Sequence, residues 1–417
     1  MTRAGAAQGS LGGSRARWRR VAGRLRFWRS PGDQPRWARP ALCSIALLGA
    51  LSYGWGMWHQ VLEPYYGGAV RSMSMSWHNF FFGSLDPVGS ISVDKLPGAL
   101  WVQSLSVRLF GFHVWAIVAP QVLAGSLTVL VLYRVVRRLG GPVAGIVAAI
   151  VLVAASPVTT GLNRDNISDT LLVLTLVLAA DGTTAALTKG LWRSLILAGV
   201  WVGLGFQFKM VQAWLILPAL AVAYLLAGPG SVKRRMLQLA SARGICAIVS
   251  LSWMTAVTLT PAHSRPYVDG SQHDSVFEQV FVYNGIGRIA GDPAFHTQAL
   301  SDFADALASP LAAARKSSPG WGRMLVGSEG RNTGWLLPVA VFAGLAVLLT
   351  RRRAPRSDPL RTGAVLWGTW LLLNLAPLDS GTFIQPYYAA VLSPAVAALC
   401  GLGFREAWCA DRSKKGV

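Results

Sequence analysis

The segment from Glu63 to Trp101 combines residues that could do chemistry with a composition too polar to cross a bilayer. It carries two isolated carboxylates, Glu63 and Asp94, and Lys95 directly follows the second. Its aromatic residues, methionines and glycines, with Tyr65 and Tyr66 next to Glu63, are unusual for an idle linker. A carboxylate can take a proton from a hydroxyl group, and a lysine can hold a phosphate by charge-assisted hydrogen bonds. We interpret this segment as the catalytic loop of a membrane enzyme.

Other polar residues lie at the ends of apolar stretches, where lipid makes them expensive unless they are paired or used. Lys209 falls between two apolar stretches without a long loop around it, and the YNGIGR motif contains a turn presenting an arginine. The remaining candidates stand at the edges of other apolar stretches: Arg164, Asn166, Asp169, Arg288, Tyr387 and Tyr388. We expect these residues to meet the catalytic loop on one side of the membrane.

Each candidate also has a purely structural interpretation. Asp94 could pair only with Lys95 or cap a turn, and the other acids could serve as helix N-terminal caps. Arg164 and Lys209 could extend to lipid headgroups. The tyrosines could belong to an interfacial aromatic belt. All of these candidates are expected on the same side of the membrane. This coincidence favours one shared site over the separate structural explanations.

Composition predicts an all-α polytopic membrane protein. The chain has 417 residues, of which 53% are hydrophobic and only 14% charged, whereas soluble domains have about 25% charged residues. Apolar stretches long enough for spans predict about ten transmembrane helices. Their expected ranges are 41–59, 114–133, 142–161, 167–185, 191–208, 211–228, 243–260, 334–350, 363–379 and 383–402.

The net charge of +21 is explained by topology. With the N-terminus in the cytoplasm, the arginine and lysine clusters all fall on the cytoplasmic side, as the positive-inside rule requires. Contact with anionic membrane lipids then accounts for the basic charge, and no nucleic-acid partner is expected. The expected organisation is a basic tail over 1–40, a membrane domain over 41–403 and a second tail over 404–417. Two outer loops cover 60–113 and 261–333.

Two short segments shape this topology. The range 97–113 must not cross the membrane, since the later loops would otherwise invert, so we expect an interfacial helix there. The RRLGGP motif between the second and third spans predicts a tight hairpin. The four cysteines avoid the outer loops, and we therefore expect no disulfide.

A set of fixed cations with one or two carboxylates at a membrane edge suits a phosphate-bearing lipid substrate. The cations would stabilise the phosphate as a leaving group, and a carboxylate would act as the base. Sugar transfer from a polyprenyl-phosphate donor needs these parts. The sequence indicates no required cofactor, no nucleotide-binding loop and no histidine pair with zinc spacing, so a divalent cation has no support.

The sequence resembles the group of GT-C glycosyltransferases that contains ArnT-like enzymes and protein mannosyltransferases (glycosyltransferase family 39), in particular a short form of an actinobacterial-type subfamily. Seven segments between about residues 50 and 402 carry the resemblance: YYGGAVRSMSMSWHNFFFGS, SVDKLPGALWVQ, LNRDNISDTLLV, FKM, YNGIGR, GWLLP and QPYYAAVLSPAVAAL.

The resemblance implies a GT-C fold with an active site on the outer face of the plasma membrane. It implies transfer of mannose, or a similar hexose or pentose, from polyprenyl phosphate to an unidentified acceptor, with inversion. Asp94 and Lys95 match the family's acid-lysine motif, and Arg164 with Asp169 match an arginine–aspartate pair. Lys209 matches a lysine facing the lipid phosphate.

The sequence departs from the family pattern at several positions. Leu62 precedes Glu63 where relatives carry a second acid, which leaves the base open between Glu63 and Asp94. Leu96 replaces a proline, Gln385 stands where relatives tend to have histidine, and the chain stops soon after the tenth expected span.

Two other functions compete with transfer. A catalytically diverged relative acting as an assembly partner would explain the departures. A transporter or flippase for a lipid-linked sugar would predict broken helices in two matching halves, and the sequence shows no such repeat.

Overall fold

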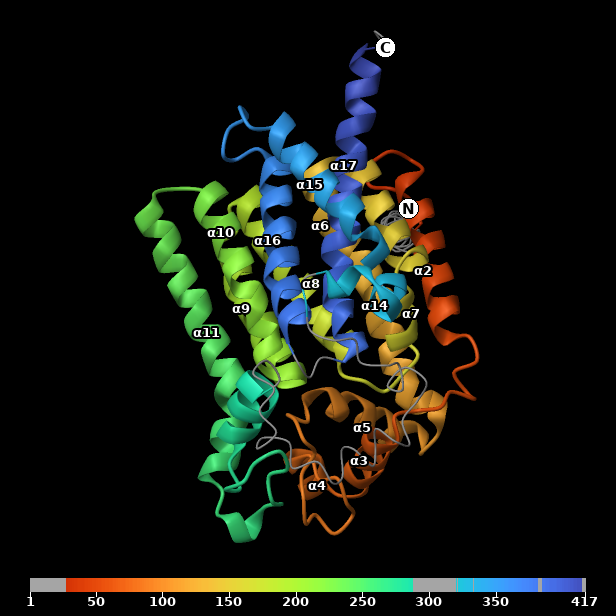
Figure 1. Cartoon of the computed structure of the whole chain (residues 1–417), viewed down its shortest axis with the longest axis vertical. Coiled ribbons are helices and arrows are strands. Elements are labelled where there is room, and N and C mark those ends of the chain that lie inside the picture. Colours follow the sequence, from red (N-terminus) through yellow and green to blue (C-terminus); the bar gives the residue numbers. More distant parts are fainter. Residues whose placement is uncertain (1–27, 288–319, 321, 333, 382–384, 415–417) are drawn as a thin grey trace, which may run out of the picture.

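The protein is a bundle of helices with a cap of short helices at one end (Figure 1). The computed structural model describes residues 28–287, 320, 322–332, 334–381 and 385–414. These residues form no sheet, only two isolated β-bridges, Ser84 with Ser92 and Ile91 with Tyr267. The all-α membrane class expected from composition is therefore confirmed.

The first half of the described chain forms the cap and the first long helices. Its elements are α2 (Ala38–Gly54), α3 (Pro64–Met75), α4 (Trp77–Phe82), α5 (Gly98–Phe110), α6 (Val114–Ala154), α7 (Pro157–Leu162), α8 (Asp169–Lys189), α9 (Arg193–Lys209), η1 (Met210–Ile216) and α10 (Leu217–Ala227).

The second half adds four long helices and several short ones. Its elements are α11 (Val232–Leu259), η2 (Ala262–Ser264), η3 (Glu278–Ile286), η5 (Arg323–Leu325), α14 (Gly327–Asn332), η6 (Gly334–Leu336), α15 (Leu337–Thr350), α16 (Pro359–Ser380), η7 (Pro386–Leu392) and α17 (Ser393–Lys414).

Five helical stretches in the described part are long and apolar enough to cross a membrane. They are Val114–Ala154, Asp169–Lys189, Arg193–Ala227, Val232–Leu259 and Pro386–Arg412, and Gly334–Thr350 is a shorter apolar stretch. The protein is thus a multi-pass membrane protein. The count of ten spans remains a prediction.

The 41-residue helix α6 reverses direction at Gly141, which has φ 83° and ψ 178°. A Cβ atom on Gly145 would lie 2.8 Å from the ring of Tyr133. In a straight helix, residues this far apart would be separated by about 18 Å. The chain therefore folds back within the RRLGGP motif, where the sequence predicts a hairpin.

Helices α9 and α11 pack closely through small residues. A Cβ on Gly199 would collide with the carbonyl oxygen of Ala242, and one on Gly203 would lie 2.6 Å from the Cβ of Val249. This spacing of small residues lets two membrane helices approach closely. It fixes α9, which ends at Lys209, against its neighbour.

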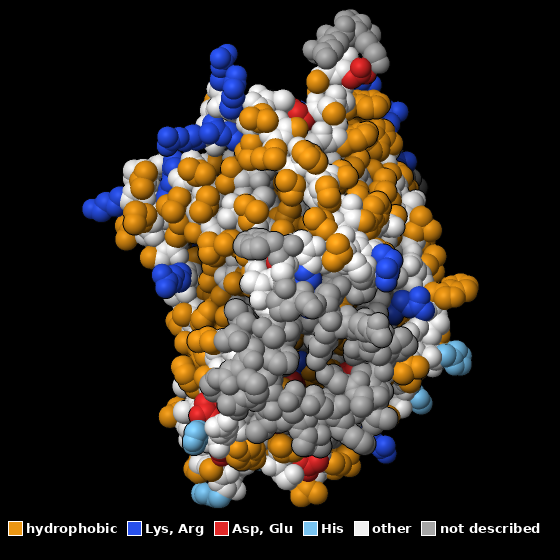
Figure 2. Space-filling view, viewed as in Figure 1, with side chains coloured by type: hydrophobic (Ala, Val, Ile, Leu, Met, Phe, Trp, Pro, Cys, Tyr) orange, Lys and Arg blue, Asp and Glu red, His pale blue; other side chains and the backbone are white. Residues whose placement is uncertain are grey.

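The two ends of the bundle differ in character. The helices α3, α4 and α5 lie together below the bundle in Figure 1. We call this end of the molecule the loop end. The connection between α15 and α16 contains Arg351, Arg352, Arg353 and Arg356 and lies at the opposite end, which we call the basic end. Figure 2 shows lysine and arginine side chains gathered there.

The 13-residue helix α5 packs against α3 at the loop end and is not among the five candidate spans. It covers most of the range 97–113, for which the sequence predicts an interfacial helix. All four cysteines are free.

The two ends should react with membrane-impermeant maleimide from opposite sides of the membrane. Val88, in the connection between α4 and α5, is 91% exposed, and Cys409 in α17 is exposed. In a background with the other cysteines replaced by alanine, Val88→Cys should label in intact cells. Cys409 alone should label only after permeabilisation. Labelling of Val88→Cys solely from the cytoplasm would contradict the predicted orientation.

Candidate active site

The loop that carries Asp94 is held by hydrogen bonds from several elements. The Tyr65 hydroxyl accepts the Asp94 backbone N–H at 2.9 Å, and the Asn284 side-chain amide donates to the Asp94 carbonyl at 2.7 Å. Gln279 donates to the carbonyl of the preceding residue, Val93, at 2.8 Å. The backbone around Asp94 is thus satisfied by α3 and by η3, which is far away in the sequence.

The Asp94 carboxylate and the Lys95 ammonium group lie side by side in this loop. Their nearest atoms are 3.8 Å apart, and both side chains are largely buried. The Tyr66 hydroxyl donates to Asp94 Oδ1 at 3.4 Å, and Lys95 Nζ lies 4.5 Å from the centre of the Tyr66 ring. A carboxylate and an aromatic face together stabilise a desolvated ammonium group.

Lys209 has the same kind of surroundings at the end of α9. Its ammonium group forms a buried ion pair with Asp169 Oδ2, at the start of α8. It also lies 3.9 Å from the centre of the Tyr388 ring and 4.9 Å from that of Tyr387. Met210 follows with a positive φ of 52°, and the chain turns there into η1. This turn fixes Lys209 at the loop end.

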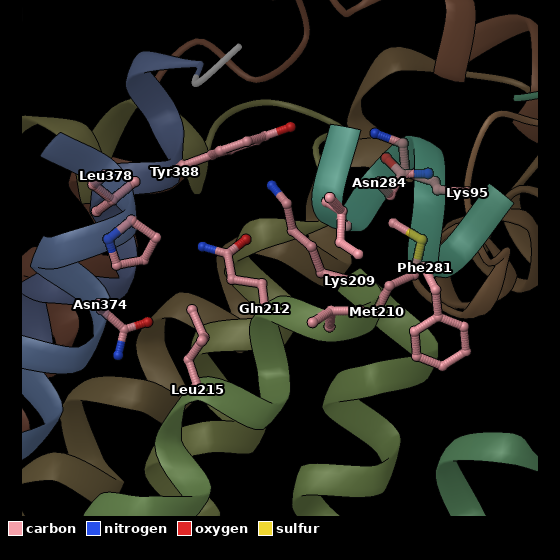
Figure 3. Close-up of a pocket in the computed structure, with 14 residues that line it drawn as sticks. Lys95, Lys209, Met210, Gln212, Leu215, Phe281, Asn284, Asn374, Leu378 and Tyr388 are labelled. Carbon is pink, nitrogen blue, oxygen red and sulfur yellow. The ribbon is translucent and has the colours of Figure 1, made fainter. Parts of the chain in front are cut away.

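Lys95 and Lys209 line one cavity of about 280 Å³. In Figure 3, Lys209 points between Tyr388 on one side and the residues Asn284 and Lys95 on the other. The rest of the wall is mainly apolar and comes from η1, η3 and α16: Met210, Val211, Gln212, Leu215, Phe281, Gly285, Ile286, Asn374, Pro377 and Leu378. Two fixed ammonium groups in a mainly apolar cavity can bind an anion that carries an apolar tail.

Glu63 and Asn166 join the catalytic loop to the start of α8. The Glu63 backbone N–H donates to Asn166 Oδ1 at 2.9 Å, and the Asn166 amide donates back to the Glu63 carbonyl at 3.1 Å. The Glu63 side chain is buried and makes no capping hydrogen bond to α3. Asn166 therefore holds the backbone of Glu63 in place, two residues before Tyr65.

Of the predicted site residues that the structure describes, Lys95, Lys209 and Tyr388 line the cavity and the others do not. The guanidinium group of Arg164 donates to the carbonyl of Trp55, just after α2, at 2.6 Å, and does not line the cavity. Its guanidinium group thus contacts the end of α2 in this structure. Arg288 lies outside the described residues.

Asp269 is a carboxylate that the sequence argument missed. Its Oδ2 accepts a hydrogen bond from the Tyr65 hydroxyl at 2.8 Å, so Tyr65 connects it to the Asp94 backbone. Burial raises the pKa of Asp269 above its usual value, and the negative charge of Asp94 adds to this effect. Burial also raises the pKa of the Tyr65 hydroxyl, and the negative charges of Asp94 and Asp269 raise it further. Tyr65 therefore stays a neutral donor to Asp269. The only signal in the sequence is an acid in the PYVDG turn.

The fold and this site define a class of helical membrane proteins with two buried lysines lining one cavity at the loop end. Residues 94–253 match the family model of dolichyl-phosphate-mannose-protein mannosyltransferase. Two relatives from Bacillus subtilis (strain 168) carry the names "Putative mannosyltransferase YkcB" and "Putative mannosyltransferase YycA". They are 32% and 30% identical to this chain, and each alignment covers 87% of it. The chain spans only 61% and 63% of their lengths.

Solved structures show the same fold. ArnT from Cupriavidus metallidurans bound to undecaprenyl phosphate matches 88% of this chain and 60% of its own, with a TM-score of 0.60 at 17% identity. The archaeal oligosaccharyltransferase AglB from Archaeoglobus fulgidus, in complex with an inhibitory peptide and a dolichol-phosphate, matches 91% of this chain and 51% of its own. Its TM-score is 0.56 at 14% identity.

These findings confirm the resemblance found in the sequence. The chain has the fold of ArnT and AglB and is similar to the mannosyltransferase family model over residues 94–253. Its assignment to an actinobacterial-type short form remains a prediction.

The ion pair between Lys209 and Asp169 should make these two residues strongly coupled in stability. Lys209→Met alone leaves a buried carboxylate unpaired and should cost about 3 kcal/mol. The double variant Lys209→Met with Asp169→Leu should recover most of that loss, as measured by thermal unfolding in detergent. Additive losses in the double variant would show that the two residues are not paired.

Asp269 should act through Tyr65. Asp269→Ala removes the acceptor of the Tyr65 hydroxyl and should lower the sugar transfer proposed for this protein about tenfold, which corresponds to about 1.4 kcal/mol in the barrier. Asp269→Asn keeps an acceptor oxygen and should retain most of the activity. Equal losses in both variants would mean that the charge, rather than the hydrogen bond, is required. A thermal-unfolding measurement on both proteins controls for folding.

Proposed function

We propose that this protein transfers a sugar, mannose or a similar hexose or pentose, from a polyprenyl-phosphate donor to an acceptor hydroxyl at the outer face of the plasma membrane. The observation that carries the proposal is the pair of buried lysines, Lys95 and Lys209, lining one cavity. Each has a carboxylate and a tyrosine ring beside it. The names of the Bacillus relatives and the lipid phosphates bound to ArnT and AglB support the same class of donor.

The lysines would hold the donor phosphate and stabilise it as the leaving group. As the bond between the anomeric carbon and the phosphate oxygen breaks, negative charge develops on that oxygen, and fixed ammonium groups lower the energy of this state. The Tyr388 ring would keep Lys209 oriented toward the phosphate. Arg288 is proposed as a further phosphate-binding cation, and Arg164 as one that acts from the edge of the bundle.

A carboxylate would remove the proton from the acceptor hydroxyl as the new glycosidic bond forms. We propose Asp94 for this role, because it is the chain neighbour of Lys95, which lines the cavity, and because its backbone is held on both sides. Glu63 is the alternative base. Attack from the face opposite the phosphate would invert the anomeric carbon. Asp169, Asn166, Tyr65, Tyr66, Tyr387 and Tyr388 would complete the substrate-binding site.

The proposal is tested by transfer in membranes that contain the overproduced protein and radiolabelled polyprenyl-phosphate mannose. Asp94→Asn should lower transfer at least about a hundredfold, because a positioned base contributes about 10²- to 10⁴-fold. Glu63→Gln should lower it less than Asp94→Asn does.

A larger loss of transfer in Glu63→Gln than in Asp94→Asn would assign the base to Glu63. Transfer measured with and without EDTA decides whether a divalent cation takes part. Intact donor with every sugar tried, in a correctly folded protein, would contradict transfer itself and favour a diverged partner role.

A further inference from the structure

A second cavity, about 560 Å³ in volume, lies between α9, α10 and α11 and shares no wall with the Lys95–Lys209 cavity. Its wall is almost entirely apolar, with Arg243 as its one charged residue. It is lined by Thr183, Leu195, Ala198, Gly199, Val202, Trp214, Leu217, Pro218, Leu220, Ala221, Leu225, Met236, Leu239, Ala240, Ala242 and Arg243. We call this space the α10–α11 groove.

The groove exists because α11 packs more closely on α9 than on α10. The contact at Gly199 and Ala242 draws α9 and α11 together. Near the loop between α10 and α11, two polar links join these helices. Tyr224 donates to Gln238 Oε1 at 2.8 Å, and Arg235 donates to the Leu225 carbonyl at 2.6 Å. These links close one end of the groove and leave apolar walls beyond it.

Part of the groove wall is buried in the bundle, such as Val202 and Leu220, and part is exposed, such as Met236 and Ala240 of α11. Only 33% of the apolar window of α11 is buried, against 78% for α8. Both α10 and α11 belong to candidate spans. Hydrocarbon chains, rather than water, therefore surround the groove, and an acyl chain is the natural occupant of its apolar part.

Arg243 is an exposed charge on the edge of this groove and within a candidate span. It forms no hydrogen bond or ion pair with any residue that the structure describes. Some arginines toward the basic end are paired: Arg138 with Asp181 at 2.7 Å, and Arg351 with Glu406 at 2.8 Å. A charged side chain inside a span is costly unless an anion or a polar cavity compensates it.

The place of Arg243 along α11 indicates which anion is within reach. It lies about three turns after the start of the helix at the basic end, close to the depth at which lipid headgroups give way to acyl chains. Its guanidinium group can bind a phosphate through two parallel hydrogen bonds. Basic pockets between membrane helices bind anionic headgroups for the same reason.

We propose that the α10–α11 groove is a binding site for one anionic phospholipid of the leaflet at the basic end. The headgroup phosphate binds Arg243, and an acyl chain fills the apolar space between α10 and α11. The lipid thereby completes the packing of α10 against α11, which the protein leaves open. This site is independent of the proposed sugar transfer.

Native mass spectrometry of the detergent-purified full-length protein tests the site directly. The probes are phosphatidylglycerol and phosphatidylcholine with identical acyl chains. The wild type should bind one phosphatidylglycerol molecule at least about tenfold more tightly than phosphatidylcholine, a difference of about 1.4 kcal/mol. Arg243→Gln should remove this preference, and Arg243→Lys should keep most of it. Arg234→Gln is the matched control, since Arg234 is an exposed arginine of α11 that does not line the groove, and it should leave the preference unchanged.

Two groove-filling variants test the acyl-chain part of the site. Ala221→Trp, or the milder Ala240→Leu if the first protein unfolds early, should weaken phosphatidylglycerol binding although Arg243 is intact. Unchanged binding in a folded groove-filling variant would overturn the proposal, because the arginine would then merely contact headgroups of the bulk leaflet. Equal losses in Arg243→Gln and Arg234→Gln would overturn it as well.

Discussion

The free energy needed to bury two ammonium groups near one cavity constrains much of this structure. Lys209 is buried beside Asp169 and the Tyr388 ring, and Lys95 beside Asp94 and the Tyr66 ring. An unpaired ammonium group at either place would cost several kcal/mol. Each lysine therefore requires its carboxylate and its aromatic neighbour. The partners of Lys209 come from α8 and η7, which are distant in the sequence, whereas Lys95 pairs with the adjacent Asp94 and with Tyr66 of α3. The bundle brings α3, α8, α9 and η7 together at one end in a way that meets this requirement.

The same requirement explains how an anionic donor could bind there. In the structure, Asp94 and Asp169 balance the positive charges of the two lysines. A phosphate that enters between the lysines would take over this role. In the proposed reaction Asp94 would then be less engaged with Lys95 and freer to accept a proton. Helix η3 supports this by holding the loop through backbone groups, with Gln279 at Val93 and Asn284 at Asp94. The carboxylate itself is left for chemistry.

Much of this architecture could be predicted from the sequence, because hydropathy and charge act locally. The helical membrane class, the reversal in the RRLGGP motif and the turn that holds Lys209 between two helices follow from short stretches of residues. The link from Asp269 through Tyr65 to the Asp94 backbone could not be predicted. It joins residues about 200 positions apart and depends on how the two outer segments pack. The direction of Arg164 was also beyond prediction, since a long side chain at a helix edge can turn toward the site or toward Trp55.

A structure of the protein determined with bound polyprenyl phosphate would test the central claim most directly. The account predicts density for the phosphate between the ammonium groups of Lys95 and Lys209, with the first isoprene units against the apolar wall formed by η1 and α16. Lys209 should then contact the phosphate as well as, or instead of, Asp169. A phosphate bound elsewhere, with both lysines still paired only to their carboxylates, would contradict the account.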